Sequence, residues 1–521
     1  MKKIFLFFLA SLLIFLGLLY GLLFTPAGNS LVASYIQKSA NENVNAIFKV
    51  KEFSLTTSKI KFVATIDENS EIDVIGDLAL LQKRVDLNYE INIKDLSKLE
   101  KFTKQKLKGN FYTKGTVAGD EKLTKINGIS NIFDSSTSYD IKLKDFKPSD
   151  IKFLITNAKI KDILYTLNQP SYANGLISID GKINNPNIAS LDGIISTVIT
   201  NGQVNNEIVN KAFNQNLMVP LTFKGDIVTN LEPNKAVSKI DFFTSMANLL
   251  VKKAVVDLKS MNINSDYLLS IPDLINLYDL TQTKMRGSIN IDGDIEKTAT
   301  LMKVSGASML LDGSLDFTLL NDDLKADIKN IDIQKLNHMM YYPDFFTSKA
   351  NASLIYNIKK QQGDLVATLS NGQFLPNEFS KLINTFAKFD ITREVYESID
   401  VKSTINEKLI NSTIDMSSDL TQLNVTKSEI DLDKSTVDAL VKTQLKGVEF
   451  DTFITGDLKS PKVSVDTTNL LKLKLKKESE KIIKKHSKKL EEKLTEKLGE
   501  KQGKKTTQEI IEGFRKFFGN E

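Results

Sequence analysis

The chain has 521 residues, and 69 Lys and Arg against 64 Asp and Glu give a net charge of only +5. Hydrophobic residues make up 41% and charged residues 26%, which is ordinary for a chain that buries a core. So mild a charge gives no reason to expect nucleic-acid binding. The lack of Cys excludes disulfides, zinc ribbons, iron–sulfur clusters and cysteine nucleophiles, and two His exclude a histidine-built metal site. We therefore expect no metal and no cofactor.

The N-terminus is predicted to be a membrane anchor, residues 1–27. Lys2 and Lys3 precede Ile4 to Phe24, a stretch of 21 residues without a charge. In a helix this stretch spans a hydrocarbon core of ~30 Å, whereas the core of a signal peptide has only about 7–15 residues. The two lysines would stay in the cytoplasm, and everything after Phe24 would be exported. A cleaved signal peptide is the alternative.

Residues 28–45 are predicted to form a short helix beyond the anchor. Leu31, Val32, Tyr35 and Ile36 follow the spacing of one helix face. Two interpretations stand beside each other. The helix closes the end of the following domain, or it lies on the bilayer surface.

Strict alternation of apolar and polar residues predicts that residues 46–468 form a repetitive β body. Leu87, Tyr89, Ile91 and Ile93, for example, alternate with polar residues. One apolar and one polar face per strand is typical of antiparallel sheets with one wetted face. The candidate site is the set of apolar residues on one face: Tyr139, Ile141, Leu143, Ile177, Ile179, Ile289, Ile291, Phe317, Leu319, Leu354, Tyr356 and Ile358.

Two repeated phrases run through this body. Glycine followed by one residue and then Ile or Leu is expected at hairpin turns, because glycine supplies a positive φ or a bulge. These glycines are Gly181, Gly225, Gly287, Gly293, Gly313, Gly363 and Gly456. A second phrase is expected to lead from a strand into a helix, and it starts at Ile93, Leu143, Leu258 and Ile328. Further helices are expected at residues 207–215, 270–280 and 378–389.

Residues 469–521 are predicted to be a basic amphipathic helical tail. Residues 472–521 hold 16 Lys and Arg against 9 Asp and Glu. An apolar stripe is formed by Ile483, Leu490, Leu494 and Leu498. Gly499 and Gly503 are expected to break this helix before a second one at residues 507–518. The tail caps the body, binds an anionic membrane or a partner protein, or forms a coiled-coil dimer.

Four features together resemble the AsmA-like proteins, relatives of TamB and of the bridge-like lipid transfer proteins. The first is the anchor followed by residues 25–28 (TPAG) and a short helix. The second is the long run of strands with Gly-Asp-Ile-like phrases. The third is residues 198–204 (VITNGQV), echoed at 369–374 (LSNGQF). The fourth is residues 454–463 (ITGDLKSPKV), which look like the end of the family's β domain.

The resemblance implies a mainly β fold, an elongated twisted antiparallel sheet forming an apolar groove. An N-terminal transmembrane helix, short interspersed helices and C-terminal amphipathic helices complete it. The implied function is non-enzymatic: an inner-membrane-anchored periplasmic protein that binds or transfers phospholipid in outer-membrane biogenesis. The implied partners are lipid acyl chains, the inner membrane through residues 4–24, and an envelope protein or membrane surface at the C-terminal helices.

Alternatives remain at the level of sequence. Periodicity alone does not distinguish an open groove from the filled core of a sandwich. A structural or assembly factor for outer-membrane proteins would bind by protein contacts at sheet edges or at the C-terminal helices. A hydrolase on a β scaffold is disfavoured, because the chain has no nucleotide-binding or nucleophile-elbow motif. His338 is expected to be an ordinary packed or surface residue.

Overall fold

The computed structural model describes residues 23–446, 448–466, 468–498 and 500–518. The protein is mainly β, with 55% strand and 23% helix, and its sheet structure is antiparallel and not closed. The predicted fold class is confirmed at this level. The chain divides into two compact units, Met1–Val304 and Ser305–Glu521. The predicted body, residues 46–468, is thus shared between two units, which are described separately below.

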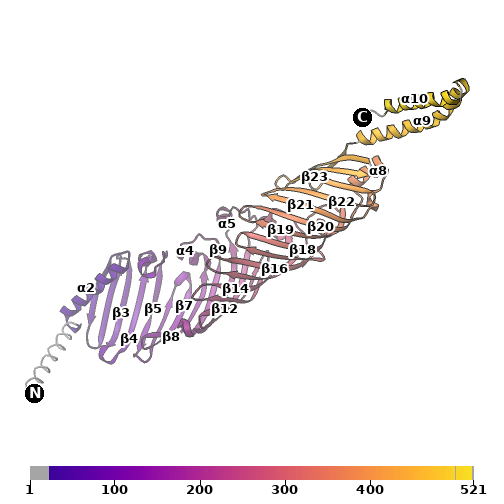
Figure 1. Ribbon diagram of the computed structural model, residues 1–521. Coiled ribbons are helices and arrows are strands. Elements are labelled where there is room, and N and C mark those ends of the chain that lie inside the picture. Colours follow the sequence, from indigo (N-terminus) through magenta and orange to yellow (C-terminus); the bar gives the residue numbers. More distant parts are fainter. Residues whose placement is uncertain (1–22, 447, 467, 499, 519–521) are drawn as a thin grey trace, which may run out of the picture. The chain divides into compact units, whose positions relative to one another are not determined.

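The N-terminal unit is a meander in which each strand from β1 to β15 pairs antiparallel with the next strand in the chain. Figure 1 shows these strands following one another in chain order. The first eight are β1 (Phe48–Leu55), β2 (Lys59–Ile66), β3 (Ser70–Ala79), β4 (Arg84–Ile93), β5 (Phe111–Gly119), β6 (Thr124–Ser130), β7 (Ser136–Lys144) and β8 (Lys147–Lys159). The others are β9 (Ala173–Asn185), β10 (Asp192–Val204), β11 (Thr222–Glu232), β12 (Lys235–Thr244), β13 (Asn248–Asp257), β14 (Ile263–Ile271) and β15 (Ile289–Lys297).

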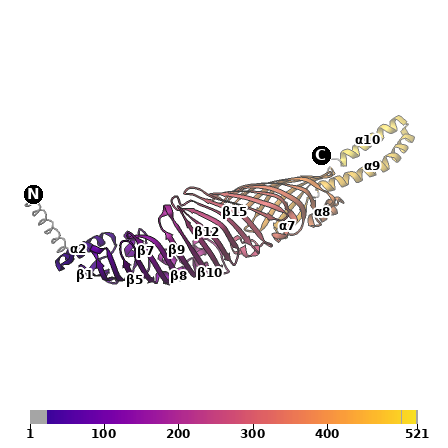
Figure 2. The same ribbon diagram turned by 90° about the horizontal axis from the view of Figure 1, so that it is seen from below.

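The C-terminal unit repeats this architecture. Strand β16 (Met302–Leu310) contains the division between the units, and from β17 to β26 each strand again pairs antiparallel with the next. These strands are β17 (Gly313–Leu320), β18 (Asp323–Asp332), β19 (Phe346–Asn357), β20 (Gln362–Phe374), β21 (Tyr396–Asn406), β22 (Leu409–Ser417), β23 (Thr421–Asp431), β24 (Thr436–Leu445), β25 (Val448–Asp457) and β26 (Lys462–Val465). Figure 2 shows the strands of this unit side by side from a second direction.

The short α-helices of each unit lie in connections at the same end of its strands. In a meander, all connections that follow even-numbered strands lie at one end of the strands. The connections that contain an α-helix follow β4, β8, β10 and β14 in the N-terminal unit and β18 and β20 in the C-terminal unit. They contain η2 (Leu96–Leu99) with α3 (Glu100–Thr103), α4 (Ile160–Thr166), α5 (Asn206–Phe213), η5 (Leu274–Leu277) with α6 (Tyr278–Thr281), α7 (Ile333–Met339) and α8 (Glu378–Ala387).

The positions of these helices correct part of the prediction from the repeated strand-to-helix phrase. The phrases that start at Ile93 and Ile328 lead into helical segments, as predicted. The phrases at Leu143 and Leu258 do not, because each enters a tight turn, after β7 and β13 respectively. The helices predicted at residues 207–215 and 378–389 are found as α5 and α8. The one predicted at residues 270–280 starts later, since β14 extends to Ile271.

The expectation that the repeated glycines form hairpin turns is wrong for three of the seven. Gly181, Gly225 and Gly293 lie inside strands, whereas Gly313, Gly363 and Gly456 lie at strand ends next to turns. A positive φ is found at Gly287 (+92°) and Gly456 (+97°). At Gly181 and Gly225 an aromatic ring from the neighbouring strand lies where a Cβ would be. A Cβ on Gly181 would lie only 2.2 Å from Cζ of Phe153, so the ring of Phe153 rests directly on the backbone of β9. A side chain at position 181 would displace it.

Helix α2 (Pro26–Asn43) covers the free edge of β1. The side-chain amide of Asn29 both donates to the carbonyl of Leu55 (3.1 Å) and accepts from its N–H (3.0 Å). Asn41 makes the same pair of hydrogen bonds to the backbone of Phe48 (2.9 and 2.8 Å). The side chain of Gln37 accepts from the N–H of Val50 (2.9 Å). These three amides take the place of a neighbouring strand and satisfy an edge that would otherwise be open to pairing.

The predicted C-terminal tail consists of α9 (Thr468–Leu498) and α10 (Glu500–Phe518), which pack against each other. The prediction that Gly503 breaks the helix is wrong, because Gly503 lies inside α10 and the second helix begins at Glu500 rather than near residue 507. One glycine in a helix costs about 1 kcal/mol, which packing against a neighbouring helix offsets.

In the part of the chain that the structure describes, no helix combines the length and the apolarity needed to cross a membrane. The predicted anchor, Ile4 to Phe24, lies outside the described residues except for its last two positions.

Candidate functional site

The candidate residues of the N-terminal unit share one face of its sheet. Residues paired across antiparallel strands point to the same side, so the register shows which side chains lie together. One line of successive pairs crosses ten strands and holds Phe53, Phe62, Val74, Tyr89, Gly115, Gly128, Tyr139, Phe153, Gly181 and Ile195. Ile141 and Leu143 follow Tyr139 at every second position of β7 and so point to the same side.

A second line on this face brings together residues that are far apart in the chain. It holds Ile177, Ile199, Gly225, Phe242, Leu249, Leu269 and Ile291. Ile177 and Ile291 are therefore two ends of one apolar row, and Ile179 and Ile289 lie in the adjacent rows. We call the side that carries both lines the apolar face of the N-terminal unit.

The C-terminal unit has an apolar face built in the same way. One line holds Phe317, Ala326, Leu354, Leu365, Ser403 and Ser412, and the next holds Leu319, Leu324, Tyr356, Gly363, Ile405 and Ile410. Four of the five candidates of this unit thus lie together. The fifth, Ile358, is in the turn after β19 and is 44% exposed, so it continues the alternation in sequence but not the strand.

The candidates within strands are all half-buried, in contrast to the fully buried side chains of each unit. Full burial is concentrated in clusters, two of which lie under helices. In the N-terminal unit one cluster joins Phe48, Ile66 and Ile93 to the inner side of α2. A smaller cluster centred on Val251 and Tyr267 has no helix in it.

In the C-terminal unit the buried cluster lies at the end of the sheet, under α8. Phe379 and Ile383 of α8 pack there with Tyr396, Ile399 and Phe450 of the strands. Away from these clusters the apolar faces have no comparable cover among the described residues. The candidate side chains are thus less buried than those of the clusters.

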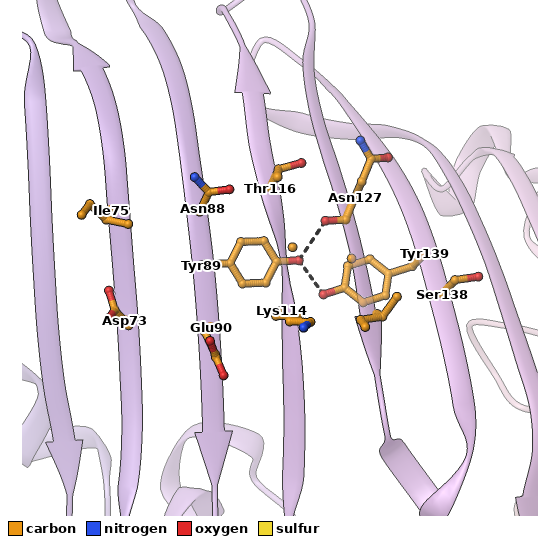
Figure 3. Close-up of a pocket in the computed structure, with 13 residues that line it drawn as sticks. Asp73, Ile75, Asn88, Tyr89, Glu90, Lys114, Thr116, Asn127, Ser138 and Tyr139 are labelled. Carbon is orange, nitrogen blue, oxygen red and sulfur yellow. Dashed lines mark hydrogen bonds between the residues drawn. The ribbon is translucent and has the colours of Figure 1, made fainter.

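A tyrosine pair interrupts the apolar face of the N-terminal unit without adding a free polar group (Figure 3). The hydroxyls of Tyr89 and Tyr139 are 2.5 Å apart, and the hydroxyl of Tyr139 is 2.5 Å from Oγ1 of Thr113. Burial, and then the hydrogen bond to Tyr139, raises the pKa of Tyr89 above its ordinary value. The ring of Tyr139 lies over Gly128, and the hydroxyl of Tyr89 lies beside Gly115 and Gly128. The candidate Tyr139 thus presents an apolar ring whose hydroxyl is already satisfied.

A hollow lies on the opposite, polar face of the N-terminal sheet. It has a volume of about 720 Å³ and is lined by residues of β3 to β7. Asp73, Glu90 and Lys114 follow one another in a single cross-strand line there, so two neighbouring carboxylates are followed by one ammonium group. In the described part of the chain no group of three or more His, Cys, Asp or Glu could hold a metal ion. His338 is exposed on α7.

The register adds residues to the face that sequence reasoning had missed. They are Phe153, Ile195, Phe242, Leu249 and Leu269. All sit beside a second apolar residue, as in Phe153-Leu154 and Ile194-Ile195, so strict alternation is hidden. Bulges in β8 and β13 add a further shift, because two residues of the bulged strand then oppose one of its neighbour.

Comparison of the chain with models of protein families, with curated proteins and with solved structures found no match.

Proposed function

We propose that the protein is a membrane-anchored lipid-binding and lipid-transfer protein of the bacterial envelope. In this proposal residues 4–24 anchor it in the inner membrane, and the rest of the chain lies in the periplasm. The apolar face of each unit forms a groove of its own that shields the acyl chains of phospholipids on their way to or from the outer membrane. No catalytic residue and no cofactor is part of the proposal, and the resemblance to AsmA-like proteins agrees with it.

One observation carries the proposal: rows of half-buried apolar side chains cross each sheet without a second layer over their middle. An apolar surface of this extent is unfavourable in water at roughly 25 cal/mol per Å², so it needs an occupant. Acyl chains fit it, because they require apolar area and no specific polar partner. Tyr89 and Tyr139 agree with this, because their hydroxyls bind each other and an acyl chain would meet only their rings.

The test uses pairs of adjacent residues that point to opposite faces of one strand. In β10, Ile195 belongs to the apolar face and the exposed Ile194 to the polar face. In β19, Leu354 and the exposed Ile355 form the same kind of pair. We expect I195D and L354D to reduce the phospholipid that co-purifies with the full-length protein at least about twofold, because a carboxylate is costly against acyl chains. I194D and I355D should leave it unchanged.

The measurement is native mass spectrometry with lipid extraction, after purification in a mild detergent, with circular dichroism to confirm the fold of each variant. Equal loss of phospholipid in both variants of a pair would mean that the apolar face does not bind the lipid. A folded wild-type protein without lipid would contradict the proposal. It would favour an assembly factor that binds proteins through its sheet edges or C-terminal helices.

A further inference from the structure

We propose that α2 lies flat on the bilayer surface, with Leu31 and Tyr35 inserted among the lipids and the connection after β4 as a second, basic contact. The inference rests on the proposed anchor and deepens the proposed function, because it states how the sheet of the N-terminal unit stands on its membrane.

Helix α2 has two faces with different tasks. The inner face carries Asn29, Gln37 and Asn41, which bind the backbone of β1. The outer face carries Leu31 and Tyr35, one helical turn apart, and these side chains are 61% and 74% exposed. Large apolar side chains on the outer face of a helix are the groups that enter the interface when a helix lies on a bilayer. Tyrosine is also enriched at that depth.

The sequence before α2 identifies the occupant of this face as a bilayer. Residues 4–24 carry no charge and end one residue before Thr25, whose side chain caps the helix by accepting from the N–H of Gly28. Two residues of extended chain reach at most ~7 Å. The start of α2 therefore stays at the membrane surface wherever residues 4–24 span the bilayer.

A basic connection borders the other end of α2. The N–H of Asn45 donates to the carbonyl of Lys98 (2.8 Å), which joins the end of the helix to the segment after β4. Residues 94–110 contain six Lys against two acidic residues, and Lys101, Lys104 and Lys106 are exposed. Phe102, among them, is 74% exposed. Lysines around an exposed aromatic ring suit an anionic lipid surface, to which each contributes about 1 kcal/mol.

This placement has a consequence for the groove. Because α2 is hydrogen-bonded along β1, a helix that lies flat sets β1 parallel to the membrane. Each following strand then lies ~4.8 Å farther from the bilayer. The rows of the apolar face of the N-terminal unit cross the strands, so they run away from the membrane, and an acyl chain can pass onto them directly.

The chain has no Trp, so the fluorescence of a single introduced Trp reports only on the surroundings of that residue. We would reconstitute full-length Y35W, F102W and F146W into vesicles of phosphatidylcholine and phosphatidylglycerol (7:3) that contain a brominated phosphatidylcholine. Phe146 is the control, because it is exposed in the turn after β7, six strands or about 30 Å from β1. We expect the emission of Y35W and F102W to be quenched at least about twofold more than that of F146W. In vesicles of phosphatidylcholine alone, the quenching of F102W should fall.

Equal quenching in Y35W and F146W would overturn the inference. So would a blue-shifted emission of Y35W without quenching, because a protein partner would then cover this face. Co-purified phospholipid is measured on the same preparations. Lipid retained by a Y35W protein that is not quenched would reject only the docking of α2, whereas quenching of Y35W in a protein without bound lipid would reject only the proposed function.

Discussion

At the residue scale, the tyrosine hydroxyls of the apolar faces form hydrogen bonds with other side-chain hydroxyls. Tyr396 is completely buried under α8, and its hydroxyl is 2.7 Å from Oγ1 of Thr421. Burial raises the pKa of Tyr396 to about 12, because the phenolate would lose its hydration. The hydroxyls of Tyr89 and Tyr139 are likewise hydrogen-bonded to each other. The faces therefore remain apolar although they contain tyrosines.

Tyr396 predicts an alkaline limit for the C-terminal unit. Its pKa is about 12 in the folded protein and about 10 in an unfolded chain. Since the folded value is the higher one, its contribution is full below pH ~10 and is lost as the pH rises toward 12, by at most about 2–3 kcal/mol. We expect the unfolding temperature of the wild type to fall in this window and that of Y396F to fall less, measured by circular dichroism from pH 8 to 12. The exposed Tyr35 supplies the control, because Y35F should behave like the wild type.

At the scale of elements, helices close the sheets where strands alone would leave open ends. Helix α2 meets the backbone of β1 with three side-chain amides, and α8 covers the buried end of the C-terminal unit. Last in the sheet of that unit, β26 has only four residues and follows Pro461, which keeps this second edge short. The first edge strand, β1, is thus protected by hydrogen bonds from a helix, whereas the last one, β26, is protected by being short.

Loss of the amides of α2 should open the edge of β1. We expect N29L with N41L to destabilise the N-terminal unit by about 1–3 kcal/mol, because two backbone N–H and two C=O groups lose their partners. Hydrogen exchange at Phe48 and Leu55 should accelerate, and light scattering after size exclusion should detect association through the free edge. N43L serves as the control, since Asn43 bonds only within its own helix among the contacts described. Unchanged exchange in the double variant would show that α2 does not protect this edge.

At the scale of the whole molecule, the division into two compact units means that each apolar face is built by its own strands. The rows through Ile177 and Ile291 lie entirely in the N-terminal unit, and those through Phe317 and Tyr356 entirely in the C-terminal unit. Under the proposed function each unit binds lipid by itself.

This independence predicts partial and additive losses. We expect I291D and Y356D each to remove only part of the co-purified phospholipid, and the double variant to remove the sum of the two losses, because distant sites without shared partners act additively. Lipid extraction per mole of protein measures this. Complete loss from either single variant would indicate one shared site and contradict independent binding.

Much of the fold could be predicted because it depends on short-range patterns. Leu87, Tyr89 and Ile91 alternate with polar residues, and this period of two defines a strand and its buried side without reference to any neighbour. The candidate site was predictable to the same extent: eleven of its twelve residues lie in strands, and within each unit these share a face. Prediction failed at Leu143 and Leu258, where tight turns and not helices follow β7 and β13.

The sequence by itself thus determined the strands, their two-sided character, the helices at both ends of the chain and the charge of the tail. These follow from side-chain period and composition, which act over a few residues. Only the tertiary structure decided that Ile177 and Ile291 form one row, that Phe153 rests on Gly181, and that helices cover the ends and not the middle of the faces. The physical reason is that alternation shows which side of a strand avoids water. Whether a second layer or another molecule covers that side depends on residues far away in the chain.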